Sequence, residues 1–180
     1  MKKRILLLFS GGSESTLLLV MAKELGYEVS CLMFDYGQRH VGEVEVGAKF
    51  CQQYDILPVI MQINLPTKSN LTKEGKTYAN VSPFHVPSRN LIFVSLAASY
   101  AEANEIDTIW LGASYEDRKN LFPDCYQEWV YQVNNVLAVN GSSKIVLEAP
   151  LLGCSKEMIQ KLLEKFNIKP NQIYSGYGRK

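Results

Sequence analysis

The sequence predicts an α/β fold: a Rossmann-like, doubly wound and mostly parallel sheet with helices on both faces. Short, nearly continuous apolar runs rich in β-branched residues alternate with longer segments whose apolar residues recur at helical spacing. Continuous apolar strands are typical of parallel sheets that helices cover on both sides. The alternation of strand and helix then favours the doubly wound architecture over a sandwich or a bundle.

The predicted elements run from one end of the chain to the other. Apolar runs predict strands at 4–9, 28–34, 57–63, 107–112 and 144–148. Helical spacing predicts helices at 17–25, 44–51, 91–100, 126–139 and 158–166. A chain of 180 residues can bury one core, so we expect a single domain over residues 1–180.

Two segments, 64–87 and 115–124, follow no period and would leave the carboxyl ends of strands. Open α/β sheets bind their ligands at that edge, so both segments are candidate functional loops.

The composition excludes several classes of partner. The chain has 47% hydrophobic residues and a net charge of +1, so no charge excess indicates a membrane or nucleic-acid partner. The first residues mimic a signal peptide, but their apolar run is short and meets Ser10 rather than a cleavage site, so we expect a cytoplasmic protein. The four cysteines are far apart without a C-x-x-C pair, which favours free thiols over zinc or disulfides.

The stretch SGGSES, residues 10–15, joins the first predicted strand to the first predicted helix. Backbone N–H groups in such a turn surround a phosphate at a helix N-terminus. The stretch lacks the lysine of a Walker A loop and the third glycine of a dinucleotide fingerprint. A plain tight turn with Ser13 as N-cap is the alternative, but the order of strand, turn, serines and amphipathic helix favours phosphate binding.

Several motifs together resemble one family. SGGSES resembles the S-G-G-x-D-S loop of ATP pyrophosphatases with an adenine nucleotide alpha hydrolase-like fold, with Glu14 in place of aspartate. FDYGQRH, VPSRN, FPDC, APLLGCSKEMIQKLL and IYSGY then follow in the order found in 7-cyano-7-deazaguanine synthases of that family. The resemblance covers nearly the whole chain.

This resemblance implies an ATP-dependent carbon-nitrogen ligase. ATP would adenylate the carboxylate of 7-carboxy-7-deazaguanine, ammonia would form the amide, and a second ATP-dependent round would give the nitrile. Loop N–H groups and Mg²⁺ would neutralise the departing pyrophosphate. Two alternatives stay open: a related enzyme that stops at the amide or uses another amine acceptor, and a non-catalytic ATP-binding homologue.

The resemblance also implies roles for individual residues. ATP binding falls to Phe9, Ser10, Gly11, Gly12, Ser13, Glu14, Ser15, Thr16, Phe34 and Arg39. Substrate binding falls to Arg89, Asn90, Asp117 and Asp124, and catalysis to Ser10, Glu14, Ser15 and Arg89.

Each of these positions has a structural alternative. Glu14 would hold Mg²⁺ or orient the loop, or it is an acid favoured by the helix dipole. Phe34 would touch adenine or pack in the core, and Arg39 would bind an anion or lie in a solvated loop. Arg89 would bind phosphate or substrate, or form a salt bridge at a helix entry.

Asp117 and Asp124 would read the amidine edge of a guanine-like ring, because a carboxylate matches two adjacent N–H donors. The alternative for residues 117–119 is a charged surface cluster.

Two departures from the family affect these expectations. Tyr126 stands where the family usually has arginine, which leaves the substrate less defined. Gly176 stands at the first of four zinc cysteines, so no zinc is expected. A homodimer is a further expectation, with Trp129 and Tyr131 as candidate interface residues and core packing as their alternative.

Overall fold

The chain forms a five-stranded parallel sheet in the strand order β3-β2-β1-β4-β5. It is a computed structural model, and it describes residues 2–38, 42–65, 85–115, 122–141 and 144–174. The strands are β1 (Arg4–Leu8), β2 (Glu28–Asp35), β3 (Val59–Gln62), β4 (Thr108–Leu111) and β5 (Val146–Glu148). The helices are α1 (Ser13–Glu24), α2 (Gly42–Gln52), α3 (Arg89–Ala103), α5 (Gln127–Asn140) and α6 (Lys156–Lys165), with 3-10 turns η1 (Pro123–Cys125) and η2 (Pro170–Gln172).

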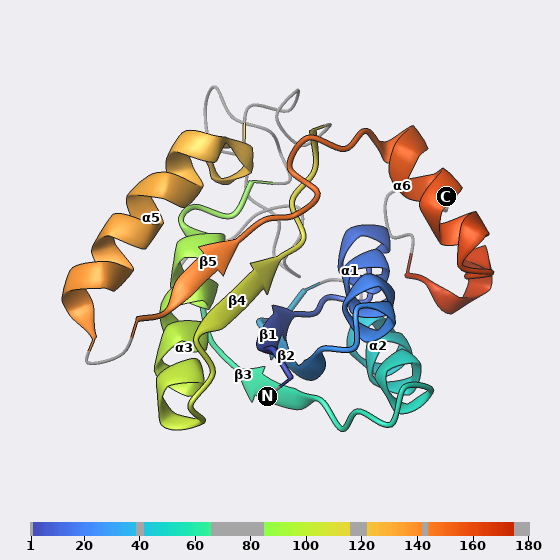
Figure 1. Cartoon of the computed structure of the whole chain (residues 1–180), viewed down its shortest axis with the longest axis horizontal. Helices are drawn as coiled ribbons and strands as arrows, with labels where there is room; N and C mark the ends of the chain where they lie inside the picture. The colour runs from blue at the N-terminus through green and yellow to red at the C-terminus, as the bar shows by residue number, and fades with distance from the viewer. Residues whose placement is uncertain (1, 39–41, 66–84, 116–121, 142–143, 175–180) are drawn as a thin grey trace.

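The helices cover both faces of the sheet, as the alternation of strand and helix predicted. Figure 1 shows α1, α2 and α6 on one face and α3 and α5 on the other. Each predicted strand and helix is present, with ends that differ by a few residues. The doubly wound prediction is therefore confirmed.

Two hydrophobic clusters fill the space between the sheet and its helices. Alternate residues of β1 supply them in turn: Ile5 and Leu7 pack with α1 and α6, whereas Leu6 and Leu8 pack with α3 and α5. The side chains of Ile5, Leu6 and Leu7 are completely buried. This two-sided burial explains why the first strand reads as a continuous apolar run rather than an alternating one.

The edge strand β3 differs from the central strands. Its residues alternate between half-buried and exposed, and Ile60 is 46% exposed. An edge strand has a neighbour on one side, and the helices cover it less completely. The prediction of strands buried on both faces therefore holds for β1 and β4 but not for β3.

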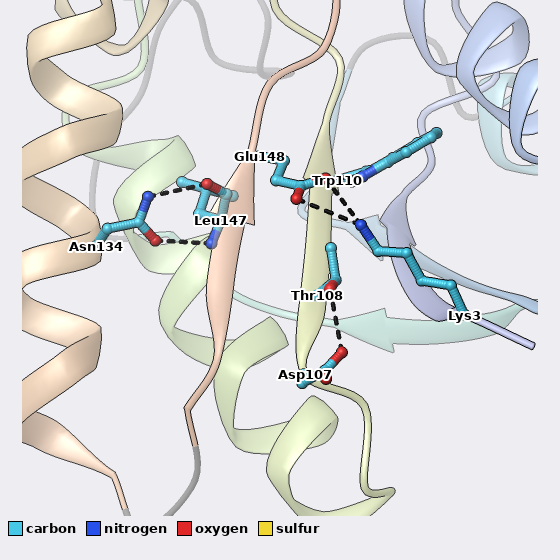
Figure 2. A network of polar contacts seen from close by, with 7 residues as sticks. All are labelled: Lys3, Asp107, Thr108, Trp110, Asn134, Leu147 and Glu148. Atoms are coloured by element: carbon cyan, nitrogen blue, oxygen red, sulfur yellow. Dashed lines mark hydrogen bonds and ion pairs between the residues drawn. The ribbon is translucent and has the colours of Figure 1, made fainter. Parts of the chain in front are cut away.

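At the opposite edge, the Asn134 side chain of α5 forms hydrogen bonds with the backbone of β5. The Asn134 amide nitrogen donates to the Leu147 carbonyl at 2.9 Å, and its oxygen accepts from the Leu147 amide at 2.7 Å (Figure 2). Nearby, the Trp110 indole donates to Glu148 at 2.6 Å, and Lys3 lies 3.4 Å from the same carboxylate. Asn134 thus satisfies groups that an open edge would leave to another strand.

Three remaining expectations concern cysteines, α5 and membranes. All four cysteines are free thiols. On α5, Trp129 packs against the second hydrophobic cluster, whereas Tyr131 is 58% exposed. Trp129 therefore follows the core-packing alternative. None of the helices in the described ranges has the length and apolar character that crossing a bilayer requires.

Candidate active site

The loop between β1 and α1 lies at the point where the winding of the sheet reverses. Strand β1 is paired with β2 on one side and with β4 on the other, and the connections to these neighbours cover opposite faces. A crevice outside the carboxyl ends of two such strands is the usual ligand site of open α/β sheets. The predicted phosphate loop therefore occupies the position that the fold itself favours for a ligand.

Two glycines outside the predicted motif let other elements approach this loop closely. A Cβ at Gly47, in α2, would lie 2.6 Å from the Met33 side chain and 3.4 Å from the Gly11 Cα atom. A Cβ at Gly112, directly after β4, would lie 3.1 Å from the Ser15 amide nitrogen. Sequence reasoning assigned no role to either residue, although an isolated glycine inside a helical pattern is a signal of close packing.

Gly11 is a position that only glycine occupies without strain. Its φ is +77°, and a Cβ there would lie 3.2 Å from the Glu43 carbonyl oxygen. Both the left-handed backbone and the close approach to α2 exclude a larger side chain. The tight turn after β1 thus depends on this glycine.

The buried Ser15 side chain stabilises the turn through hydrogen bonds. Its hydroxyl accepts a hydrogen bond from the Ser10 amide at 3.2 Å, donates to the Gly12 carbonyl at 3.2 Å, and lies 3.2 Å from the Ser10 hydroxyl. The side chain is 3% exposed. Ser15 therefore shapes the loop, and Ser10 is the exposed serine of the pair.

The start of α1 presents backbone donors. The N-cap is Gly12, with no side-chain cap, so the alternative of Ser13 as N-cap is wrong. Within the described ranges, the amides of Gly11, Ser13 and Glu14 make no hydrogen bond. N–H groups at a helix N-terminus attract anions through both hydrogen bonding and the helix dipole.

Glu14 brings a carboxylate to the same turn. It is half-buried, and one of its oxygens accepts a hydrogen bond from the Ser13 hydroxyl at 2.8 Å. Mg²⁺ is commonly held by one or two carboxylates together with phosphate oxygens, so Glu14 fits a Mg²⁺–phosphate group. Among the described residues, no three His, Cys, Asp or Glu side chains come together as a metal site.

Three side chains predicted to bind ATP point into the protein. Phe9 is 2% exposed and stacks on Phe50, with ring centroids 6.3 Å apart. Thr16 is completely buried, and its hydroxyl has no hydrogen-bond partner among the described residues. Phe34 stacks on Phe93 at 4.1 Å and follows the core-packing alternative. In this conformation, Phe9 and Thr16 can offer a nucleotide only their main chain.

Arg89, at the start of α3, is held by aromatic and polar neighbours. Its guanidinium lies 5.7 Å from the Tyr36 ring centroid and 5.9 Å from that of Phe93, a geometry that favours cation–π attraction. It donates to the Tyr36 hydroxyl and to the Asn90 side-chain oxygen, both at 3.3 Å. The preceding Ser88 has a left-handed backbone, φ 56°, which is strained for serine.

Asn90 links this group to η1. Its amide nitrogen donates a short hydrogen bond to one oxygen of Asp124, and the Cys125 thiol lies 3.7 Å from the other oxygen. Three residues predicted to bind substrate, Arg89, Asn90 and Asp124, therefore form one connected group. Of the other predicted site residues, Arg39 and Asp117 lie outside the described residues, as does most of the 64–87 loop.

Glu43, in the first turn of α2, is a site residue to which sequence reasoning gave no role. Burial raises the pKa of its carboxyl group to about 7, and the Arg89 guanidinium opposes that rise. The Tyr174 hydroxyl also has a raised pKa, mainly from burial and further from Glu43. The position of Glu43 shortly after FDYGQRH was the only indication in the sequence that it belongs to the site. Arg89 and Tyr174, which define its environment, are distant in sequence.

Gln38 is a second residue whose role appears only in the structure. It is 5% exposed; its oxygen accepts from the Tyr36 amide at 2.9 Å and its nitrogen donates to the Phe34 carbonyl at 3.2 Å. Both bonds fix the turn after β2 and so fix the position of Tyr36 beside Arg89. The site therefore combines a turn with backbone N–H donors, a cation and a half-buried carboxyl group.

Comparison with known proteins identifies a family. The model of "Queuosine biosynthesis protein QueC" matches residues 4–180. A 7-cyano-7-deazaguanine synthase of Picrophilus torridus is 36% identical over 98% of this chain and 80% of its own length. One of Oceanobacillus iheyensis is 33% identical over 97% of this chain and 84% of its own length.

A solved structure supports the same fold. The tRNA thiolase NcsA of Methanococcus maripaludis superposes with a TM-score of 0.64 at 14% identity, over 99% of this chain and 62% of that one. Such low identity speaks for the fold alone, whereas the family model and the two synthases match nearly the whole sequence. This chain belongs to the QueC family of queuosine biosynthesis proteins.

Proposed function

We propose that this protein is an ATP-dependent ligase that adenylates the carboxylate of 7-carboxy-7-deazaguanine and uses ammonia to form the amide and then the nitrile. The observation that carries the proposal is the set of amides at Gly11, Ser13 and Glu14, which make no hydrogen bond within the described ranges. They lie beyond the carboxyl end of β1, where the winding of the sheet reverses, in a member of a family that contains synthases of this nitrile.

The loop would receive the phosphates of ATP. Its amides and the N-terminus of α1 would neutralise the β- and γ-phosphates, which leave together as pyrophosphate. Mg²⁺ held by Glu14 would add positive charge to the leaving group. Ser15 would keep the turn in shape by its bonds to Ser10 and Gly12.

The group formed by Arg89, Asn90 and Asp124 would receive the substrate. The Arg89 guanidinium can pair with a carboxylate through two parallel N–H donors. Asp124 would accept hydrogen bonds from the amidine edge of the deazaguanine, in exchange for those from Asn90 and Cys125. The planar rings of Tyr36 and Phe93 lie beside Arg89, where a flat heterocycle can stack.

The chemical steps follow from the poor reactivity of a carboxylate. A carboxylate oxygen attacks the α-phosphorus of ATP, and pyrophosphate leaves with the electrons of the broken P–O bond. Ammonia then attacks the acyl carbon, its nitrogen loses one proton, AMP leaves, and the amide forms. In the second round the amide oxygen is adenylated in the same way, and the nitrile forms as AMP leaves with that oxygen and the nitrogen loses both of its protons. The protein chiefly holds two anions in line.

The proposal also covers the partners. Substrate and ammonia are the small-molecule partners, and a cytoplasmic setting would supply the ATP. A homodimer would use the exposed side of α5, where Tyr131 and Val136 are each 58% exposed. Light scattering of the purified protein tests the dimer, which a monomeric mass at micromolar concentration contradicts.

The test is an assay of the purified protein with ATP, Mg²⁺, ammonium and 7-carboxy-7-deazaguanine. Pyrophosphate and AMP release is followed together with the product mass. A nitrile product supports the full proposal. An amide alone, or an adduct with another amine, would instead indicate a related enzyme that stops at the amide or uses another amine acceptor. Binding of ATP without pyrophosphate release indicates a non-catalytic homologue. Arg89→Lys should lose most turnover, and Ser95→Ala, an exposed change on the same helix, is the matched control.

A further inference from the structure

The segment after α6 returns across the protein to the phosphate loop. Ile168 is 6% exposed, and Ile173 packs against the hydrophobic cluster formed with α1 and α2. Between them, the Gln172 side chain accepts from the Lys169 amide at 2.8 Å and donates to Gln53, beyond α2, at 3.2 Å. These contacts bring the following residue, Tyr174, to the turn after β1.

Tyr174 bonds directly to that turn. Its backbone N–H donates to the Gly11 carbonyl oxygen, with 3.0 Å between the two heavy atoms. Because the bond uses the main chain of Tyr174, any residue except proline could make it. The side chain has a different environment, near Glu43. The two contributions of Tyr174 can therefore be separated by substitution.

This bond fixes one peptide group of the loop. In a planar trans peptide the carbonyl oxygen and the following N–H point in opposite directions. Holding the Gly11 oxygen therefore fixes the direction of the Gly12 N–H, which donates to the Ser10 hydroxyl at 3.3 Å. A peptide between two glycines is otherwise the least restricted in the turn, because neither residue has a Cβ.

We propose that Tyr174 is a positioning residue of the pyrophosphate site: its backbone N–H holds the Gly11–Gly12 peptide, and with it the turn that presents the neighbouring amides of Gly11, Ser13 and Glu14 to the anion. The inference rests on the proposed function for the identity of the ligand. Ligand binding and closure of the 168–174 segment must then stabilise each other, because coupling between two sites is reciprocal.

Two variants at this position test the proposal. Tyr174→Pro removes both the side chain and the N–H, whereas Tyr174→Ala removes only the side chain. Ile173 has φ −114° and ψ 139°, which is the conformation preferred before proline. Calorimetry with inorganic pyrophosphate and Mg²⁺ should give roughly fivefold weaker binding for Tyr174→Pro than for Tyr174→Ala. Equal affinities would overturn the proposal.

The kinetics separate positioning from a general loss of structure. The KM for ATP should rise by the same factor in Tyr174→Pro relative to Tyr174→Ala, with the KM for the 7-deazaguanine carboxylate equal in both. A rise in both KM values to the same extent would indicate a structural role and overturn the proposal.

A measurement on the unmodified protein guards against poor folding of the proline variant. Hydrogen exchange at the Tyr174 amide should slow when pyrophosphate and Mg²⁺ are added, and unchanged exchange would overturn the proposal. If the two variants differ in pyrophosphate affinity as expected but the unmodified protein shows no turnover, the positioning role of Tyr174 stands and the proposed function is wrong. If both variants form the nitrile equally well with equal KM for ATP, the proposed function stands and the positioning role is wrong.

Discussion

The Ser15 hydroxyl lies 3.2 Å from both the amide nitrogen and the hydroxyl oxygen of Ser10. It joins the first turn of α1 to the residue where the chain leaves the sheet. The same hydroxyl donates to the Gly12 carbonyl, so one buried oxygen atom organises both ends of the turn. A side chain in this position controls the shape of the turn between β1 and α1.

Ser15→Ala should therefore weaken both stability and nucleotide binding. The change removes the Ser15 hydroxyl that accepts from the Ser10 amide, whereas the Gly12 carbonyl keeps its bond from the Thr16 amide. Loss of the partner of a part-buried amide costs about 1–3 kcal/mol of unfolding free energy. We expect the KM for ATP to rise roughly tenfold as the turn loosens. Urea denaturation and pyrophosphate-release kinetics measure the two effects. Ser95→Ala, which removes an exposed hydroxyl bonded to the Leu91 carbonyl, is the control. An unchanged KM would show that Ser10 and Gly12 hold the turn without Ser15.

Gly112→Ala should push the start of α1 away from the end of β4 and so displace the loop between β1 and α1. The new methyl group would lie 3.1 Å from the Ser15 amide nitrogen and 3.2 Å from the Glu14 Cβ atom, so the start of α1 must move. Overpacking of this kind costs about 1–3 kcal/mol. We expect a higher KM for ATP together with a lower midpoint of urea denaturation.

The matched control for this change is Gly153→Ala, because no described atom beyond its two chain neighbours lies within 4 Å of a Cβ at Gly153. Comparable losses in both variants would mean that the added methyl group acts through the backbone alone and that the contact with α1 is unimportant.

The sequence predicts the elements better than the directions of their side chains. Apolar periodicity predicts the first strand and the first helix, and the glycines predict the loop between them. At the junction the period changes from that of a strand to that of a helix. Periodicity therefore could not show that Phe9 and Thr16 point into the core while Ser10 is exposed.

Residues whose roles arise from tertiary contacts were the hardest to predict. Glu43 has its raised pKa because it is buried, and its charged neighbour Arg89 belongs to another helix. Gly112 matters because β4 lies beside β1, which is a property of the strand order. Pairing across the sheet cannot be read from the local sequence, so the roles of Glu43 and Gly112 follow only from the fold.

Tyr36→Phe should lower kcat/KM for the carboxylate substrate, because it removes one hydrogen bond that positions Arg89 while keeping the aromatic ring. The variant loses the 3.3 Å hydrogen bond from Arg89 to the hydroxyl but keeps the ring beside the guanidinium. One such bond corresponds to roughly a fivefold loss in kcat/KM for the carboxylate substrate. Steady-state kinetics measure it, with Tyr131→Phe on the exposed side of α5 as control. If kcat/KM is retained, the ring and Asn90 suffice to position Arg89.

Glu105→Gly should stabilise the protein. Glu105 follows the end of α3 with φ 56°, a left-handed conformation that costs a residue with a Cβ about 1 kcal/mol and that glycine adopts freely. Its carbonyl, which accepts from Arg4 at 3.2 Å, is retained. Urea denaturation should show the gain. Asn167→Gly, at the equivalent position after α6 with φ 58°, is the control and should gain less because asparagine tolerates this conformation. Equal gains would contradict the argument.

Glu43→Gln should stabilise the protein more at high pH than at low pH. Because burial raises the folded pKa from 4.5 to about 7, the favourable contribution of protonated Glu43 is complete below 4.5 and is lost as the pH rises through about 7. Glutamine cannot ionise and avoids that loss. For a carboxyl group partly open to solvent, we expect a difference of about 1 kcal/mol between about pH 5 and about pH 8. Urea denaturation at both pH values measures it, with the exposed Glu45→Gln as control for the lost charge. A constant difference across this range would mean that Glu43 is ionised in the folded protein throughout, held so by Arg89.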